Sequence, residues 1–215
     1  MTFQDKIKKA KGLIEEYIEK YPRYGIACSW GKDSMVLLDF FMEKVSSKKP
    51  KVFSVLSDTE FQATLNLRDK IIGKGYIEYQ EFIFAQNGSR DDCCRAPKVE
   101  KFKQALANYD CWFSGLRRDE GATRNEVDYV VNPDRFGKVK VNPLLDFTEI
   151  EIWKYLAVNQ IPVNQKYKDG YRSLGCKNCS SLPLNDQEME RAGRWKGIFD
   201  EKGEQISECG IHSKL

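Results

Sequence analysis

The sequence passes from an apolar run into a glycine-containing turn at Gly25-Ile26-Ala27-Cys28-Ser29-Trp30-Gly31-Lys32-Asp33-Ser34. The apolar residues predict a short buried strand over 25–29, and a helix through 35–41 follows it. The turn between them offers hydroxyl groups, the Lys32 ammonium group and the N–H groups of a helix start, all of which can face an anion. A plain turn capped by Asp33 or Ser34 is the alternative, and we favour phosphate binding over it.

Strands and helices alternate along the chain after this turn. Apolar residues at helical spacing predict helices over 3–20, 62–73, 97–107 and 150–158, and β-rich runs predict strands over 51–56, 76–84, 111–114 and 139–141. Thr148 and Glu151 fit a capping box that opens the helix near 150. This alternation predicts an α/β fold with a mostly parallel sheet.

The same pattern predicts where a ligand binds and how the chain is organised. Ligands of parallel sheets bind beyond the carboxyl ends of the strands, so we expect segments 29–34, 57–60 and 114–118 on one face. After about 160 the regular pattern fades into a polar segment, which gives no sign of a second compact domain. We therefore expect one Rossmann-like domain over 1–197 and a flexible C-terminal tail over 198–215.

The composition is typical of a globular protein rather than a disordered one. Of 215 residues, 41% are hydrophobic and 31% are charged. The formal net charge of +3 is too small to indicate a nucleic-acid partner. The first residues lack the apolar run of a signal peptide, and no stretch approaches the ~18 apolar residues of a membrane span. We expect a cytoplasmic protein without a membrane partner, in a compartment that keeps thiols reduced.

Seven cysteines in such a chain indicate metal binding or thiol chemistry rather than disulfide bonds. Cys93 and Cys94 are adjacent, and Cys176-Lys177-Asn178-Cys179 is a CxxC pair. Four thiolates suit a zinc ion or a 4Fe–4S cluster. Adjacent cysteines point apart, which favours the larger cluster over zinc and over buried thiols without a metal. Pro97 suits the first turn of a helix. The positive end of that helix and the Lys98 ammonium group both favour the thiolate form of the adjacent cysteines.

The remaining cysteines differ in their surroundings. Cys209 lies in Ser207-Glu208-Cys209-Gly210-Ile211-His212, where the glycine allows movement and His212 can lower the pKa of the thiol. An incidental exposed cysteine is the alternative, which composition alone favours. Cys28 and Cys111 lie in predicted strands and are expected in the core.

Two basic groups are candidates for anion binding. Arg117 and Arg118 follow a predicted strand, and Arg191 and Arg194 lie three residues apart in a helix-like stretch. Residues at this spacing share a helix face, so both guanidinium groups can bind one anion. A solvated surface is the alternative, and spacing alone favours it.

The motifs together carry a resemblance to a known family. The turn matches the SxGxDS signature of the PP-loop adenine-nucleotide hydrolases and differs from the Walker pattern GxxxxGK[ST]. From about residue 24 to 212 the chain resembles the sulfonucleotide reductases, the adenylyl-sulfate and phosphoadenylyl-sulfate reductases of sulfate assimilation. The matching stretches are SWGKDS (29–34), SDTE (57–60), CCRAPKVEKF (93–102), WFSGLRRDEGATR (112–124), NPLLDFTEIEIWKYL (142–156), GYRSLGCKNC (170–179), ERAGRWKG (190–197) and SECGIH (207–212).

The resemblance implies roles for individual residues. It implies that a 4Fe–4S cluster is ligated by Cys93, Cys94, Cys176 and Cys179, and that Lys98 links it electrostatically to the substrate. The nucleotide phosphate would lie near Ser29, Gly31, Asp33 and Ser34, with Lys32 able to contact an extra phosphate and Asp58 near the adenosine. The phosphosulfate oxygens would be held by Arg117 or Arg118 with Arg191 and Arg194. Cys209 would be the nucleophile and His212 its companion.

The implied activity is reduction of adenylyl sulfate, or of its 3′-phosphorylated form, to sulfite and AMP. The Cys209 thiolate would attack the sulfur, and a thioredoxin-like dithiol protein would release sulfite from the S-sulfocysteine. Cluster-bearing members favour the substrate without the 3′-phosphate. SWGKDS is closer to the ATP-using form of the loop, so a PP-loop ATP pyrophosphatase of sulfur transfer is one alternative. A zinc-stapled nucleotide-binding module is another, and a homo-oligomer is compatible with the sequence.

Overall fold

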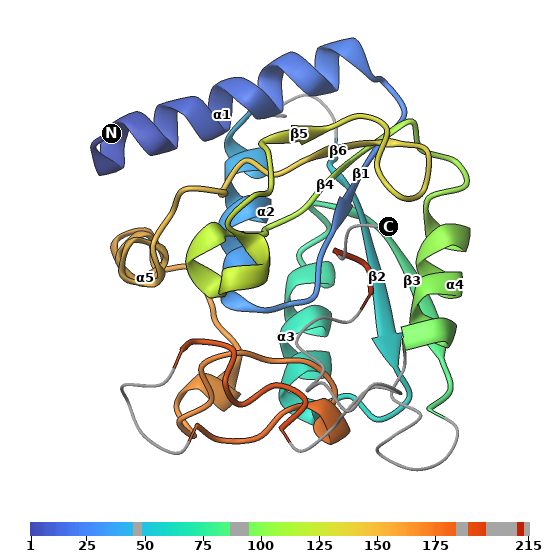
Figure 1. The fold of residues 1–215 in the computed structure, drawn as a ribbon, viewed down its shortest axis with the longest axis vertical. Helices are drawn as coiled ribbons and strands as arrows, with labels where there is room; N and C mark the ends of the chain where they lie inside the picture. The colour runs from blue at the N-terminus through green and yellow to red at the C-terminus, as the bar shows by residue number, and fades with distance from the viewer. Residues whose placement is uncertain (45–48, 87–94, 184–188, 197–209, 213–215) are drawn as a thin grey trace.

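The computed structural model describes the chain except for residues 45–48, 87–94, 184–188, 197–209 and 213–215 (Figure 1). The described residues form a six-stranded sheet in the order β3-β2-β1-β4-β6-β5. Its strands are β1 (Tyr24–Ala27), β2 (Lys51–Ser57), β3 (Glu78–Phe84), β4 (Cys111–Phe113), β5 (Val130–Val131) and β6 (Val139–Val141). All neighbours pair in parallel except β5, which lies antiparallel to β6. The predicted mostly parallel α/β fold is confirmed, and β5 is an addition to it.

Helices connect the strands close to the predicted positions. They are α1 (Phe3–Lys20), α2 (Lys32–Lys44), α3 (Gln62–Ile72), α4 (Arg95–Ala105) and α5 (Glu149–Val158). The capping box predicted for α5 is present, since the Thr148 side chain accepts from Glu151 N and the Glu151 carboxylate accepts from Thr148 N. None of the described helices is both long enough and apolar enough to cross a membrane.

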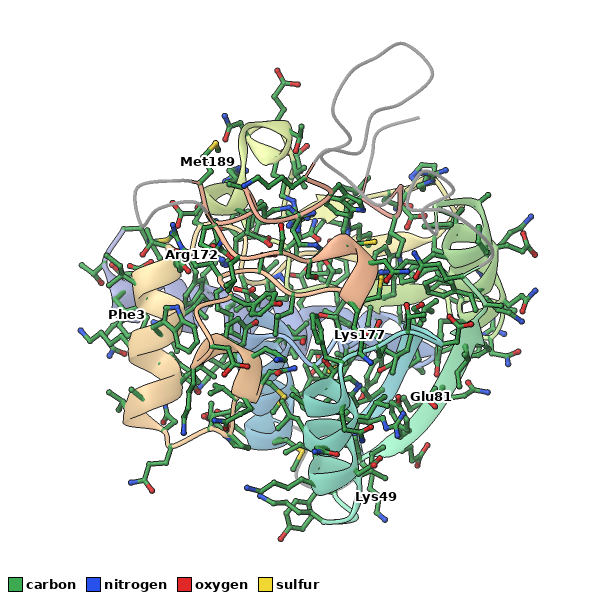
Figure 2. The ribbon with its side chains drawn as sticks, turned by 90° about the horizontal axis from the view of Figure 1, so that it is seen from below. Phe3, Lys49, Glu81, Arg172, Lys177 and Met189 are labelled. Atoms are coloured by element: carbon green, nitrogen blue, oxygen red, sulfur yellow. The ribbon has the colours of Figure 1, made fainter. Side chains whose placement is uncertain are left out.

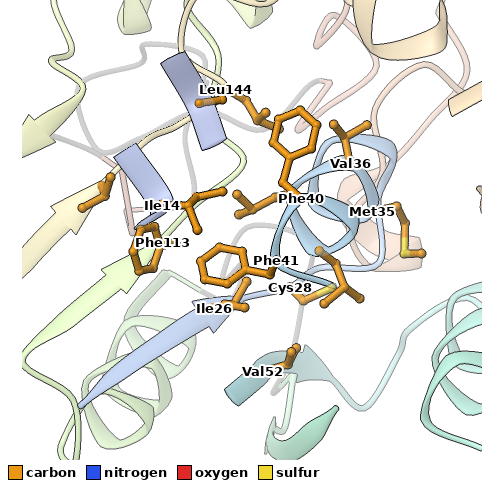
Figure 3. Close-up of a cluster of buried hydrophobic side chains, with 14 of the residues drawn as sticks. Ile14, Ile26, Cys28, Met35, Val36, Phe40, Phe41, Val52, Phe113 and Leu144 are labelled. Atoms are coloured by element: carbon orange, nitrogen blue, oxygen red, sulfur yellow. The ribbon is translucent and has the colours of Figure 1, made fainter. Parts of the chain in front are cut away.

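The buried hydrophobic side chains of the described residues form two cores, one on each face of the sheet. The first core holds buried side chains of α1, α2, α3 and α5, and Figure 3 shows Phe40 and Phe41 of α2 among them. Both phenylalanines are fully buried, and burial of each such side chain stabilises the fold by about 1.5–3 kcal/mol. Cys28 and Cys111 lie in this core, as predicted. The second core, on the opposite face, contains Phe102 and Leu106 from α4 and its C-terminal extension, packed with residues from the C-terminal part of the chain.

The carboxyl ends of the parallel strands face the lower end of the molecule in Figure 1. There the segments after β1, β2 and β4 meet. The chain after α5 also crosses this end, through the short 3₁₀ helices η4 (Gln165–Tyr167) and η5 (Lys177–Cys179). Figure 2 views the molecule from this end, with Arg172 and Lys177 labelled on the crossing segment.

Candidate active site

The turn after β1 is held in shape by contacts from distant parts of the chain. Trp30 adopts a positive φ of 61° and is fully buried, with its ring 5.5 Å from that of Tyr79. The Tyr167 hydroxyl accepts a hydrogen bond from Lys32 N at 2.8 Å. A Cβ atom at Gly31 would lie 3.3 Å from that hydroxyl, so a side chain there would require Tyr167 to shift by a few tenths of an ångström.

A second glycine brings the end of β4 against the start of α2. A Cβ atom at Gly115 would lie 3.1 Å from the carbonyl carbon of Asp33 and 3.2 Å from Ser34 N. Such distances are shorter than an ordinary van der Waals contact, so a side chain here would push the two segments apart. Gly115 therefore sets the distance between the turns that follow β1 and β4.

The segments beyond β1, β2 and β4 line one pocket together, which confirms that they share a face. Nine of the predicted site residues line it: Ser29, Gly31, Lys32, Asp33, Ser34, Lys98, Arg191, Arg194 and His212. Asp58 does not line it, and its carboxylate accepts from Gln86 N at 3.0 Å. The structure thus brings most of the predicted side chains together around one cavity.

Lys32 faces inward to a carboxylate rather than outward to solvent. It is 1% exposed, and its ammonium group donates to the Glu190 carboxylate and, at 3.1 Å, to the carbonyl of Arg172. Burial opposes the charge, but Asp33, Tyr167 and Glu190 together raise the pKa of Lys32 above its usual value. The extra phosphate expected at Lys32 would therefore have to compete with Glu190.

Arg117 occupies the other side of Glu190. Its fully buried guanidinium group donates to Asp33 Oδ1 at 2.6 Å and to Glu190 Oε2 at 2.5 Å. Burial disfavours the ionised form of Asp33, but the charges of Arg117 and Lys32 outweigh it and lower the pKa of this carboxyl group. Asp33, Glu120 and Glu190 lie within 4.8 Å of one another, and each is paired with a lysine or arginine. We interpret this cluster as a network of ion pairs in which acidic and basic side chains alternate.

Neither Arg117 nor Arg118 lines the pocket, although one of them was expected to hold the substrate. Arg118 instead donates to Asp146 and to the carbonyl of Val127. The pocket contains Arg124 in their place, 4% exposed and paired with Glu120. The only sequence signal for Arg124 is its place in the stretch 112–124 that resembles the reductases.

The segment around Arg191 and Arg194 forms turns, which corrects the prediction of a helix there. Arg194 pairs with Ser180 in an antiparallel bridge, and a Cβ atom at Gly193 would lie 2.2 Å from the carbonyl oxygen of Ser181. These contacts tie the turns to the segment after η5. Both arginines nevertheless reach the pocket.

Arg194 is fixed on several sides. Its guanidinium group donates to the carbonyls of Cys179 at 3.0 Å and Leu174 at 2.7 Å. It also lies 4.3 Å from the ring centre of Trp195 and rests against Gly175, where a Cβ atom would be 2.3 Å from Nη2. A cation held in this way presents its charge to the pocket without losing further conformational freedom on binding.

The predicted CxxC pair lies beside this arginine, in the second core. Cys176 and Cys179 are buried, and their Sγ atoms are 3.3 Å apart across η5. Cys93, Cys94 and Cys209 lie outside the described residues. The sulfur pair alone is compatible with a cluster or with zinc.

Two buried donors near the sulfur pair test whether a cluster fits. Among the described residues, the Gln86 Nε2 and Trp195 Nε1 groups have no acceptor. The Gln86 Oε1 atom lies 3.8 Å from Cys176 Sγ, and Trp195 packs in the second core with both cysteines. Buried N–H groups are normally paired, so a group rich in acceptors, such as the sulfur atoms of a cluster, fits this region.

His212, which also lines the pocket, lies against Trp112. The ring centres are 6.2 Å apart, and the Lys140 ammonium group is 3.1 Å from His212 Nδ1. Burial and the positive charges of Lys140 and Arg124 lower the pKa of His212 well below its usual value of 6.5. His212 is therefore neutral at physiological pH. Sequence reasoning missed Lys140, since a lysine within a strand carries no signal of its partner.

Comparison with known proteins identifies the family of this chain. The family model for the phosphoadenosine phosphosulfate reductase domain matches residues 23–182. A protein of Halalkalibacterium halodurans named adenosine 5′-phosphosulfate reductase is 34% identical over 212 residues, covering 89% of this chain and 87% of that relative. A protein of Gloeobacter violaceus named phosphoadenosine 5′-phosphosulfate reductase is 30% identical, covering 87% of this chain and 81% of that relative.

Solved structures share the fold at lower sequence identity. The phosphoadenylyl-sulfate reductase of Candida auris, solved as a phosphate complex, has a TM-score of 0.65 at 17% identity and covers 81% of this chain and 90% of its own. The FMN adenylyltransferase of Candida glabrata with FMN and an ATP analogue has a TM-score of 0.66 at 21% identity and covers 96% of this chain and 79% of its own. On the match over 23–182 and the identity to curated relatives, this chain belongs to the phosphoadenosine phosphosulfate reductase domain family.

Proposed function

We propose that this protein reduces adenosine 5′-phosphosulfate to sulfite and AMP. The observation that carries the proposal is the pocket at the carboxyl ends of β1, β2 and β4. It combines the turn 29–34, four cationic side chains and the end of the ECGIH motif, and the CxxC pair lies close by. Relatives at 30–34% identity named adenosine 5′-phosphosulfate reductase support this choice of nucleotide.

The pocket residues divide into two groups in this proposal. The hydroxyls of Ser29 and Ser34, with the backbone around Gly31, face the nucleotide phosphate at the start of α2. The phosphosulfate oxygens are held by Lys98, Arg124, Arg191 and Arg194, all of which line the pocket. Asp33 holds Arg117 rather than the substrate, and Asp58 stays a prediction for the adenosine.

The reaction is a transfer of the sulfo group to a thiolate. Cys209, in the proposed tail 198–215, attacks the sulfur, the bond from sulfur to the phosphate oxygen breaks, and AMP leaves with both electrons of that bond. This forms S-sulfocysteine. A thioredoxin-like dithiol then attacks the Cys209 sulfur, sulfite leaves, and the second thiol of the partner closes its disulfide and releases Cys209. The pocket cations stabilise the charge that develops on the leaving phosphate.

We further propose that Cys176 and Cys179, with Cys93 and Cys94, ligate a 4Fe–4S cluster. When bound, the cluster would hold the surrounding segments together, and with its four thiolate ligands it would carry a net negative charge. Lys98 places its charge between this region and the substrate. Gln86 and Trp195 provide N–H groups for its sulfur atoms.

The test uses iron-replete protein purified without oxygen and mixed with adenosine 5′-phosphosulfate in the absence of thiols. We expect mass spectrometry to find one added SO₃ group on the peptide containing Cys209, with an equal amount of AMP released. Cys209→Ser should give no adduct and no AMP, whereas Cys111→Ser, which changes a buried core thiol, should keep both.

Parallel samples with phosphoadenosine phosphosulfate and with ATP separate the alternatives. A faster adduct with the first would assign the 3′-phosphorylated substrate. Pyrophosphate release from ATP without any adduct would contradict the proposal and assign a PP-loop pyrophosphatase.

A further inference from the structure

We propose that Lys140 is a positioning residue that holds His212 as a neutral imidazole with its single proton on Nε2. A lysine ammonium group has only N–H bonds to offer and cannot accept a hydrogen bond. Its position 3.1 Å from Nδ1 therefore requires an unprotonated Nδ1. The proton of the neutral ring must then be on Nε2, the opposite nitrogen.

Lys140 is fixed in place by the sheet. It lies in the middle of β6 between Val139 and Val141, both of which pair with β4, and it is only 6% exposed. Its ammonium group is 5.2 Å from the ring centre of Trp112, the same ring that stacks on His212. The strand thus presents the lysine and the indole ring to His212 as one rigid surface.

Residues 210–212 are held at this surface by two further contacts. Arg135 donates to the carbonyl oxygen of Gly210, and Ile211 is buried in the second core with Trp112 and Trp195. His212 is therefore fixed through its backbone, its neighbour and one ring nitrogen. The positive groups that act on the ring, Lys140, Arg124, Arg191 and Lys98, all disfavour a second proton on it.

This protonation state changes what His212 can do in the proposed reaction. Because Nδ1 is engaged and Nε2 carries the proton, the ring offers a hydrogen-bond donor and no free base. We expect His212 to stabilise a negative charge, on a thiolate or a sulfate oxygen, rather than to remove the thiol proton. The catalytic consequence rests on the proposed function, whereas the protonation state of the ring does not.

The chain contains a single histidine, so one nuclear magnetic resonance experiment reads this ring without ambiguity. Iron-replete, full-length protein labelled with ring-¹⁵N histidine should show a protonated Nε2 and an unprotonated Nδ1 from pH 6 to pH 8. In Lys140→Met we expect a mixture of the two neutral tautomers, or a ring that takes up a proton within this range. Lys140→Arg should restore the wild-type pattern, and Lys138→Met, one residue before β6, should leave it unchanged.

The outcomes separate this inference from the proposed activity. A wild-type ring protonated on Nδ1 or on both nitrogens would overturn it, even if the sulfo adduct on Cys209 forms normally. So would an unchanged ring spectrum in a folded Lys140→Met protein. If the His212 ring shows the expected tautomer but no adduct forms on Cys209, the proposed function is contradicted and the assignment of Lys140 stands. If the proposed function and the proposed tautomer are both correct, adduct formation in a single turnover should slow by about tenfold in Lys140→Met. Loss of a residue that orients a functional histidine costs about tenfold or more in activity.

Discussion

A single carboxylate, Glu190, joins the two ends of the candidate site. It binds Lys32 from the turn after β1 and Arg117 from the segment after β4, and all three side chains are nearly fully buried. Buried charges are tolerated only when they are paired, so removing one partner leaves an uncompensated charge. The segment that carries Arg191 is thereby tied to the turn that faces the nucleotide phosphate.

Asp33 should make the stability of this network depend on pH. Its pKa is lowered below 3.8 in the folded protein by Arg117 and Lys32 against the opposing effect of burial, so it contributes stability above that pH and loses it as pH falls through the folded pKa. We expect Asp33→Asn to lower the free energy of unfolding at pH 7 by about 2–3 kcal/mol, because Arg117 keeps Glu190 as a partner. Urea unfolding at pH 7 and pH 3 measures the difference, which should shrink at pH 3.

The matched control is Asp69→Asn, which removes an exposed ion pair with Arg68 and should cost less than about 1 kcal/mol at either pH. Equal losses for Asp33→Asn at pH 7 and pH 3 would show that the carboxylate charge does not stabilise the fold.

Gly175→Ala should displace the Arg194 guanidinium group. The new Cβ atom would lie 2.3 Å from Nη2 and 2.6 Å from Cζ, so the guanidinium group must leave its hydrogen bonds to the carbonyls of Cys179 and Leu174. We expect the KM for adenosine 5′-phosphosulfate to rise about tenfold, the value of one charge-assisted hydrogen bond, and the melting temperature to fall while the protein stays folded. Gly121→Ala is the control, since nothing lies within 4 Å of its added Cβ atom. An unchanged KM in Gly175→Ala would mean that Arg194 does not contact the substrate.

At the scale of helices and strands, most of the fold could be predicted from local pattern. The spacing of apolar residues placed α1 at its observed bounds and the other helices within about three residues, because the apolar face of a helix is encoded in its own sequence. The strand β5 was missed, since two residues are too few to show alternation. The turns at 190–196 were missed because they depend on Ser180 and Ser181, which are distant in sequence.

The capping box of α5 gives a prediction at this scale. Thr148 satisfies the backbone N–H of Glu151, and the Glu151 carboxylate also binds Lys6 of α1 at 2.7 Å. We expect Thr148→Ala to lower the free energy of unfolding by about 1 kcal/mol, because a helix N-terminus loses its side-chain acceptor. Thr148→Ser should recover most of it, and kcat should not change in either variant. Chemical denaturation measures the loss, and a value near zero would show that solvent replaces the cap without cost.

At the scale of the whole molecule, the position of the pocket could be predicted, but the ion pairs beside it could not. The rule that ligands bind at the carboxyl ends of parallel strands correctly brought three segments to one pocket. The partners of Lys32 and Arg117 lie 158 and 73 residues away in Glu190, and no local pattern indicates such pairs. The sequence predicts both residues as anion ligands, whereas their counter-charges become visible only in the folded chain.

The last prediction follows from the two cores. The sheet separates them, and the proposed cluster lies in the second core only. Cys28 lies in the first core, apart from Cys176 and Cys179 in the second, and burial raises the pKa of its thiol to about 11. Cys176 lies in the second core beside the Gln86 Nε2 and Trp195 Nε1 groups, which have no acceptor within the part of the chain that the structure describes. We expect Cys28→Ala to keep the iron content and visible absorption of the wild type, and Cys176→Ala to lose both. Hydrogen exchange should then rise in η5 and α4 but not in α1 and α2, since only the second core loses the group that fills it. Full iron binding by Cys176→Ala, or a loss of protection that spreads equally to both cores, would contradict the placement of the cluster.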